Sequence, residues 1–256
     1  MNKPYVVENG YTVPIQAPLV NESCLPPFEC LDNNGICAYF TVNPDVIKKY
    51  LEPTPFEYYS NVCYAYVSDW NNATVTDGTN YGFFDSGIGI PVLYRGRKGI
   101  HILFEYEDQD YAIAAGRELW GYPKKYGEVS LEEKDGIIRG TVRKNGKDII
   151  QLEVDTTQQL TTPISRPALF PHFQIKVMPK PDGPGIEYKK ILSRDPSADF
   201  KTKSYTEHPV KVKFEGIPHN RLDEFTPIEV FGASLTVGDA YVTNETGWTK
   251  VEEVFE

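Results

Sequence analysis

Two adjacent lysines, Lys124 and Lys125, are the residues of this chain best suited to covalent chemistry. A lysine amine attacks a carbonyl carbon only when it is neutral, whereas an ordinary lysine has a pKa near ~10.4 and is protonated at neutral pH. Burial and a second ammonium held beside the first both favour the neutral amine. We therefore predict that Lys124 is a nucleophile and that Lys125 supplies the charge that favours its neutral form.

Aromatic residues stand just before the lysine pair. Most Lys-Lys pairs lie on a solvated surface, but Trp120 and Tyr122 are not residues of such a surface. We interpret both as walls of a pocket, although packing in the core explains them nearly as well. Arg117 and Glu118 stand upstream, where Glu118 can hold Arg117 or a lysine in an ion pair. These four residues are the candidate substrate-binding residues of the segment.

The run Gly-Arg-Glu-Leu-Trp-Gly-Tyr-Pro-Lys-Lys at residues 116–125 resembles the signature of the acetoacetate decarboxylase family. Stretches at residues 43–55, 85–92 and 166–183 resemble further parts of that family, in the same order along the chain. The likeness covers roughly residues 30–255. It implies that Lys124 forms a Schiff base beside a second cation, Lys125, which is the known way in which that family activates its lysine.

The resemblance also implies a fold and further site features. It implies a mainly β (α+β) protein, an antiparallel barrel or cone with few short helices, formed as a single domain by residues 36–256. Residues 1–35 are rich in Pro, Asn and Glu with few apolar runs, and we interpret them as an N-terminal arm. Asp85 takes the position of the family's pocket acid, whereas its sequence context alone is typical of a turn. The resemblance implies no cofactor, and it implies a homo-oligomer.

Three positions depart from the family. Counting along the chain places Asn33 where the family has an arginine and Tyr66 where it has a glutamate, and the pocket glutamate is shortened to Asp85. Because a site built around one charge distribution rejects another, we expect a different substrate. Tyr66 and Tyr241 are candidate phenolic proton donors. Arg166, in the Arg-Pro stretch that resembles the family, is a candidate anion site.

Composition excludes several kinds of partner. A net charge of −10 and a pI near 5.0 argue against a nucleic-acid partner. No apolar stretch approaches the ~20 residues of a membrane-spanning helix and no signal peptide is recognisable, so we expect a soluble, cytoplasmic protein without a membrane partner. The spacing of Cys24, Cys30, Cys37 and Cys63 indicates free thiols, and four scattered histidines predict no metal site.

Hydrophobic alternation and turn residues predict a mainly antiparallel β protein. Asn43 caps a short helix that ends near Leu51. The turns Asp-Gly at residues 135–136 and Asn-Gly at 145–146 join three strands into a meander over residues 129–154. Other strands are predicted at residues 62–67, 88–94, 100–106, 173–178, 187–192, 210–214 and 234–242, and residues 180–185 fit either a linker or a hairpin loop.

These observations favour a cofactor-independent Schiff-base lyase that decarboxylates a small or medium β-keto acid through Lys124. A protonated imine withdraws electrons, so a carboxylate β to the original carbonyl leaves as carbon dioxide. The same lysine also serves aldol addition or dehydration on a pyruvate-like or polyketide-like carbonyl compound, an alternative almost equal to the first. A third alternative is a protein that has lost catalysis and binds a ligand or partner. The presence of both lysines makes this third alternative the least favoured.

Overall fold

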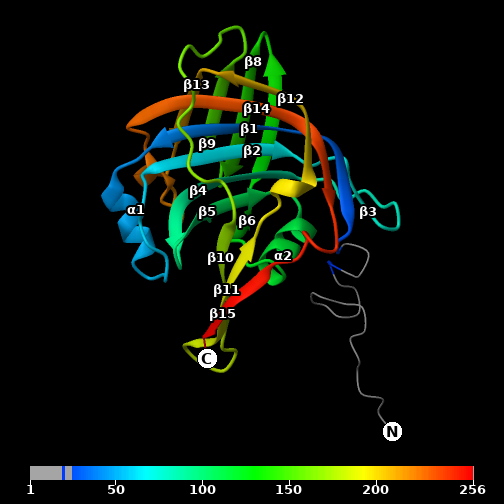
Figure 1. Cartoon of the computed structure of the whole chain (residues 1–256), viewed down its shortest axis with the longest axis vertical. Helices are drawn as coiled ribbons and strands as arrows, with labels where there is room; N and C mark the ends of the chain where they lie inside the picture. The colour runs from blue at the N-terminus through cyan, green and yellow to red at the C-terminus, as the bar shows by residue number, and fades with distance from the viewer. Residues whose placement is uncertain (1–18, 21–24, 256) are drawn as a thin grey trace.

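The computed structural model of the chain describes residues 19–20 and 25–255, and within them the protein is mainly β (Figure 1). The described residues contain two α-helices, α1 (Pro44–Leu51) and α2 (Asp110–Glu118), together with the 3-10 turns η2 (Ser197–Asp199) and η3 (Leu222–Phe225). None of the helices within the described residues is both long and apolar enough to span a membrane.

The strands divide into two sheets. They are β1 (Phe28–Thr41), β2 (Val62–Asp69), β3 (Ala73–Val75), β4 (Phe84–Tyr94), β5 (Arg97–Glu107), β6 (Lys124–Tyr126), β7 (Glu128–Lys134), β8 (Ile137–Lys144), β9 (Lys147–Asp155), β10 (His172–Pro179), β11 (Ile186–Arg194), β12 (Phe200–His208), β13 (Val210–Phe214), β14 (Glu229–Val242) and β15 (Lys250–Phe255).

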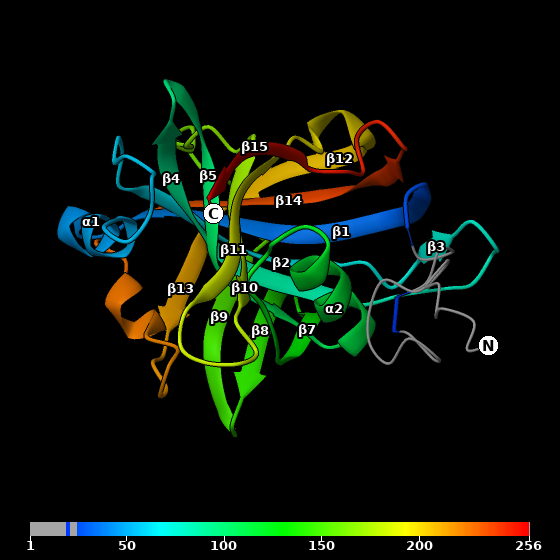
Figure 2. The ribbon, with the colours of Figure 1, turned by 90° about the horizontal axis from the view of Figure 1, so that it is seen from below.

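The larger sheet has eleven strands in the order β12-β14-β1-β2-β4-β5-β10-β11-β15, with β3 paired to β1 and β6 paired to β5. Strands β12 and β15 end this path, so no closed barrel is found among the described residues, and the barrel or cone that the family resemblance implied is not confirmed. The long strand β1 runs across the molecule, with α1 near one end and β3 near the other (Figure 2).

The smaller sheet has the order β13-β9-β8-β7 and contains the predicted meander. Both tight turns have the expected conformation, since φ is 51° at Asp135, 75° at Gly136, 52° at Asn145 and 75° at Gly146. Positive φ at both central residues is the requirement of a type I′ turn, whose twist matches that of the flanking strands. The two hairpins are therefore confirmed.

The main hydrophobic core lies between the two sheets. Alternate residues of β1, such as Ile36 and Phe40, meet meander residues such as Val142 and Ile150 in this core. Because strand side chains alternate between faces, Tyr39 of β1 points to the other face of the large sheet. There it joins a second apolar cluster, defined by Tyr39, Tyr64, Ile100, Ile102 and Tyr122, which we call the tyrosine cluster.

Most predicted elements are confirmed, and a few are shifted or were not predicted. The helix α1 begins after Asn43, whose side chain accepts a hydrogen bond from the Asp45 amide. Residues 180–185 form the loop of an antiparallel hairpin between β10 and β11, not a linker. Strand β1 begins at Phe28, inside the predicted arm, most of which lies outside the described residues.

The helix α2 and the strands β3, β6, β12 and β15 were not predicted. Strand β12 is largely solvent-exposed and polar, so it lacks the alternation that identifies a half-buried strand. Cys30, Cys37 and Cys63 are free thiols as predicted, and Cys24 lies outside the described residues.

The turn geometry predicts a difference between two glycine substitutions. Gly146→Ala places a side chain at φ +75°, where no atom obstructs it, so we expect the free energy of unfolding to fall by about 1 kcal/mol through backbone strain alone. Gly183→Ala is the matched control, because Gly183 also faces open space but does not have a positive φ. Urea unfolding of both variants measures the difference; equal stabilities would contradict the strain argument.

Candidate active site

Strand β6 carries both lysines and lies parallel to the end of β5, with Lys124 beside Glu105 and Lys125 beside Tyr106. The aliphatic part of the Lys124 side chain lies against Gly116 of α2, where any Cβ would overlap its Cδ and Cε atoms. The glycine of the Gly-Arg-Glu run therefore leaves the space that the lysine side chain fills. Helix α2 and strand β5 together fix where the amine lies.

The Lys124 amine is buried among carboxylates. Its Nζ atom forms an ion pair with Glu107 and lies 3.9 Å from Glu105 Oε1. The Lys124 side chain is 10% exposed, and those of Glu105 and Glu107 are 4% and 0% exposed. One oxygen of each glutamate, Oε2, is buried without a hydrogen-bond partner among the described residues. A buried carboxyl oxygen without a hydrogen-bond partner is available to a bound molecule.

A β-bulge aims the two glutamates at the pocket. The register between β4 and β5 shifts at Leu103, which faces no partner on β4. Residues 100 and 102 face the tyrosine cluster, so simple alternation would place Phe104 on the same face. The extra residue exchanges the two faces for the residues that follow it, so Glu105 and Glu107, not Phe104, face the pocket. Sequence reasoning missed both glutamates, although two acids at alternate positions at the end of an apolar strand were a usable signal.

Tyr66 and Asp85 complete the acidic cluster. The Tyr66 hydroxyl lies 3.0 Å from Glu105 Oε1, to which it donates, and 3.3 Å from Asp85 Oδ1. The Tyr66 ring packs on β4 at Gly87, where a Cβ would lie only 3.0 Å from the ring. The structure thus brings together Lys124, Asp85 and Tyr66 of the predicted site.

Burial dominates the protonation of these acids. It raises the pKa of Glu105 to about 8, against the opposing charge of Lys124. Burial also raises the pKa of Asp85 and that of the Tyr66 phenol. Glu105 therefore holds a proton at neutral pH, which makes it a proton donor beside the lysine amine.

Lys125 faces away from this cluster, which corrects the predicted arrangement of the two lysines. Its Nζ donates a hydrogen bond of 2.8 Å to Asn220 Oδ1, which also accepts one from Tyr106. Burial, followed by the charges of Lys144 and Arg117, lowers the pKa of Lys125. Successive residues of a strand point to opposite faces, so the second ammonium is not held beside the first.

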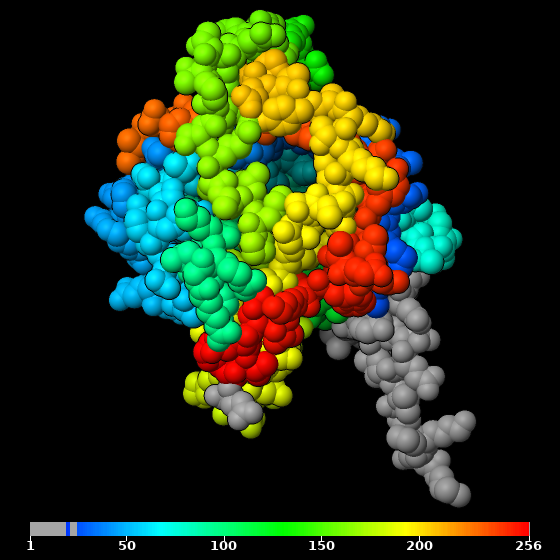
Figure 3. Space-filling model, viewed as in Figure 1, coloured from blue at the N-terminus to red at the C-terminus, as the bar shows by residue number. Residues whose placement is uncertain are grey.

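Tyr122 and Trp120 lie in the apolar surroundings of the amine. The centroid of the Tyr122 ring is 5.8 Å from Lys124 Nζ, and its hydroxyl lies 3.0 Å from His172 Nδ1. Trp120 packs against the tyrosine cluster from the same loop. The space-filling view shows a hollow whose floor has the blue of β1 and the blue-green of the strands that follow it (Figure 3).

The model of one protein family, acetoacetate decarboxylase (ADC), matches residues 12–250. The chain belongs to the acetoacetate decarboxylase family. In sequence it is similar to the acetoacetate decarboxylase of Chromobacterium violaceum, with 26% identity over 190 residues that cover 72% of each chain.

Solved structures of the same fold include an acetoacetate decarboxylase, with a TM-score of 0.80, 19% identity and 95% of each chain covered. The fold is also that of the enduracididine biosynthesis enzyme MppR, solved with the condensation product of pyruvate and imidazole 4-carboxaldehyde. For MppR the TM-score is 0.75 and the identity 17%, over 94% of this chain and 95% of that one.

Three residues that family-based reasoning associated with the site lie outside it. Arg117 is exposed and donates to the backbone carbonyl of Lys124 over 3.1 Å, so it supports strand β6 and does not face the cluster. Glu118 is exposed. Asn33, at the position where the family has an arginine, donates to the carbonyl of Asp69 over 2.7 Å. The exposed position of Arg117 and Glu118 argues against the predicted substrate contacts.

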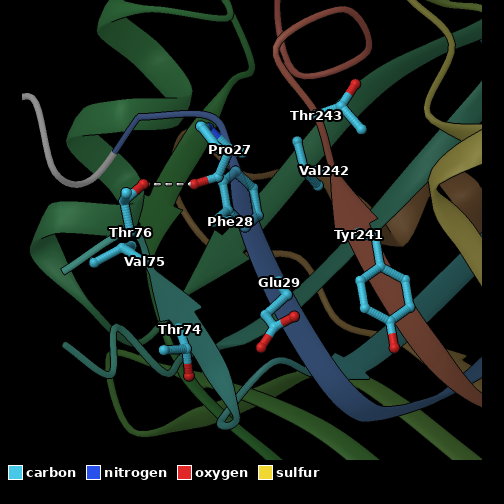
Figure 4. A pocket seen from close by; sticks show the side chains of 9 residues that line it. All are labelled: Pro27, Phe28, Glu29, Thr74, Val75, Thr76, Tyr241, Val242 and Thr243. Atoms are coloured by element: carbon cyan, nitrogen blue, oxygen red, sulfur yellow. Dashed lines mark hydrogen bonds between the residues drawn. The ribbon is translucent and has the colours of Figure 1, made fainter. Parts of the chain in front are cut away.

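Tyr241 also lies apart from Lys124. It lines a groove of about 410 Å³ formed by β1, β3 and β14, together with Phe28 and Thr76 (Figure 4). Its hydroxyl donates to Asp239 over 3.3 Å. The groove contains neither lysine, so its size alone does not mark it as the catalytic site, and Tyr241 is not placed to donate a proton there.

Arg166 lies beside the tyrosine cluster. Its guanidinium is 5.3 Å from the centroid of the Tyr39 ring and forms an ion pair with Glu207 and a contact with the Tyr205 hydroxyl. The chain's own carboxylate therefore occupies the predicted anion site. Ile164 and Leu169, from the same segment between β9 and β10, pack against the tyrosine cluster.

The raised pKa of Glu105 predicts that the protein becomes less stable as pH rises. The ordinary pKa of this carboxyl is 4.5 and the folded value is about 8, so between these values the folded state binds more protons than the unfolded state. The free energy of unfolding should therefore fall as pH rises through this window and level off above pH ~8. Glu105→Gln should flatten the fall, whereas the exposed control Glu133→Gln should not. Urea unfolding between pH 5 and 9 measures both slopes; equal slopes in the two variants would refute the assignment.

Proposed function

We propose that this chain is a Schiff-base lyase in which Lys124 forms an imine with a keto acid, and that its reaction is the decarboxylation of a β-keto acid. The observation that carries the proposal is the buried contact of Lys124 Nζ with Glu107, beside a second glutamate that holds a proton. Membership of a family of decarboxylases supports the same reaction.

Glu107 is the proposed base for the lysine amine. Transfer of one proton from the Lys124 ammonium to the Glu107 carboxylate gives a neutral amine and a neutral acid without separating charge. We expected a neighbouring ammonium to favour the neutral amine of Lys124, and the proton transfer to Glu107 takes that role. A neutral amine and a neutral acid avoid the cost of keeping two ions away from water. The amine then adds to the ketone carbon of the substrate to give a carbinolamine.

Glu105 is the proposed acid for loss of water. Its proton passes to the carbinolamine hydroxyl, which leaves as water, and the nitrogen becomes a protonated imine. The bond from the α-carbon to the β-carboxylate then breaks. Carbon dioxide leaves, and the bonding electrons move to the iminium nitrogen to give an enamine. The buried, acidic surroundings favour this step, because they stabilise a departing neutral molecule better than a carboxylate.

A proton must next reach the enamine carbon. Asp85 and Tyr66 supply it in our proposal, because Tyr66 connects Asp85 to Glu105 by hydrogen bonds. Water then hydrolyses the resulting iminium, releases the ketone and restores Lys124. In this scheme Lys125 is a positioning residue, which anchors strand β6 through Asn220.

Reductive trapping tests the nucleophile. With acetoacetate and sodium borohydride, we expect a covalent adduct on Lys124, located by peptide mass spectrometry, whose mass lacks the carboxylate because carbon dioxide leaves before reduction. Lys124→Ala should give no adduct. Lys125→Met, the matched control, should still be modified at Lys124. An adduct on a different residue would contradict the assignment, and no adduct with any carbonyl compound would support the ligand-binding alternative.

Aldol condensation or dehydration is the second candidate function. The enamine of a lysine-bound pyruvate is a carbon nucleophile, and it adds to an aldehyde when no β-carboxylate is present to leave. Two observations favour this use. Tyr66 stands where the family has a glutamate, and the MppR structure holds a condensation product of pyruvate and an aldehyde.

Carbon dioxide release separates the two candidates. We expect release from acetoacetate or from larger β-keto acids, measured by a coupled assay, at a rate that Lys124→Ala abolishes. Absence of release from every β-keto acid, together with a reducible imine formed with pyruvate, would reject decarboxylation and favour the aldol reaction.

A further inference from the structure

Arg194 is a half-buried cation close to the hydroxyl of Tyr122. It ends strand β11 and is paired in register with His172 of β10, so both side chains lie on one face of the sheet. The hydroxyl of Tyr122 contacts His172, while the ring of Tyr122 faces Lys124 Nζ. One tyrosine therefore connects the lysine amine with the surroundings of Arg194.

The partners of Arg194 leave part of its guanidinium available. Its side chain is 13% exposed, its Nε donates to the carbonyl of Thr246 over 3.2 Å, its guanidinium also hydrogen-bonds the Tyr122 hydroxyl, and its Nη2 lies 3.8 Å from Asp199 Oδ2. The last distance exceeds that of a hydrogen bond, and Asp199 Oδ2 has no hydrogen-bond partner among the described residues. The ion pair with Asp199 is therefore loose. Because an arginine offers five N–H donors in a planar fork, some donors of Arg194 remain available to a ligand.

Trp120 provides a second donor at the same place. The guanidinium carbon of Arg194 lies 5.6 Å from the centroid of the Trp120 ring. The indole Nε1 of Trp120 is buried without a hydrogen-bond partner among the described residues. A buried N–H without an acceptor is rare in proteins unless a ligand or water supplies one. An acceptor bound between Arg194 and Trp120 would receive hydrogen bonds from both side chains.

The electrostatics of this region suit an anion. Burial, and then the charge of Arg194, lowers the pKa of His172 to about 3, so the imidazole is neutral at neutral pH and does not add a second charge. Burial raises the pKa of Tyr122, and Arg194 opposes that shift, which places the guanidinium close to the phenol. The charges of Glu105 and Asp85 also raise the pKa of Tyr122, so the acids of the Lys124 cluster and Arg194 act on the same phenol.

We propose that Arg194, with the indole N–H of Trp120, binds a second carboxylate of the substrate, so that the preferred substrate class is a β-keto acid with an anionic group at the opposite end of its chain. This inference rests on the proposed function of Lys124. The leaving carboxylate lies next to the acids of the lysine cluster, whereas the second carboxylate stays on the product and is held throughout the reaction.

The chemistry distinguishes the two carboxylates. A cation beside the leaving carboxylate stabilises the ground state and slows its loss, whereas a cation beside a carboxylate that does not react contributes uniform binding. Arginine recognises a carboxylate through two parallel N–H donors.

A matched pair of substrates tests the proposal. 3-Oxoadipate and 3-oxohexanoate have the same chain length and differ in the second carboxylate. We expect kcat/KM for carbon dioxide release to favour 3-oxoadipate by roughly 10- to 100-fold, the range of a charged hydrogen-bonded contact. Arg194→Gln should bring the ratio near one. The control Arg166→Gln, at an arginine that is paired with Glu207, should leave the ratio unchanged.

A second variant is expected to strengthen the preference for 3-oxoadipate, which a misfolded protein would not do. Asp199→Asn removes the carboxylate that competes for Arg194, so the preference for 3-oxoadipate should rise. A parent protein without a preference, an Arg194→Gln variant that keeps it, or an Asp199→Asn variant that loses it would each overturn the proposal.

Direct binding separates this inference from the proposed function. In a Lys124→Ala background, which cannot form an imine, calorimetry should detect adipate more tightly than hexanoate, and adding Arg194→Gln should remove the difference. If no β-keto acid yields carbon dioxide or a trapped adduct, the lyase function fails and this measurement alone decides the anion site. Adipate that binds no better than hexanoate would refute it.

Discussion

The burial of one ammonium among three carboxyl groups is the constraint on which the rest of this site depends. Lys124, Glu105 and Glu107 are nearly or fully removed from water, and the removal of each ion from water costs several kcal/mol. Two features of the fold reduce that cost. Glu107 is paired directly with the amine, and Glu105 holds a proton because burial raises its pKa to about 8.

Glycines allow this burial because they let large side chains lie against the backbone. Gly116 of α2 accepts the aliphatic part of Lys124, and Gly87 and Gly89 of β4 accept the rings of Tyr66 and Tyr64. At each of these positions a Cβ would meet the neighbouring side chain at less than ordinary van der Waals contact. The glycines of the two family-like stretches therefore shape the pocket, while the residues between them form the core.

The distribution of charge around Lys124 gives a new interpretation to the departures from the family pattern. Tyr66 on β2 stands where we expected the family's glutamate, and carboxyl groups are present at the site because β5 contributes Glu105 and Glu107. Asn33 stands where we expected the family's arginine, and Arg194 is the cation whose charge acts on Tyr122, together with the charges of Glu105 and Asp85. Acids and a cation therefore act on one tyrosine, and the proposed substrate with two carboxylates suits this arrangement.

The sequence by itself determined the local features of this protein. The two Gly-containing turns, the capped helix α1 and most strands depend on short-range patterns, so residues a few positions apart were enough to predict them. The Gly-Arg-Glu run likewise pointed to Lys124 as the candidate nucleophile. Only the tertiary structure decided which side chains surround the amine. Adjacent lysines point to opposite faces of β6, and a bulge at Leu103 turns Glu105 and Glu107 into the pocket. Both outcomes depend on pairing with strands distant in the sequence, and one extra residue in a strand reverses the face of every side chain that follows.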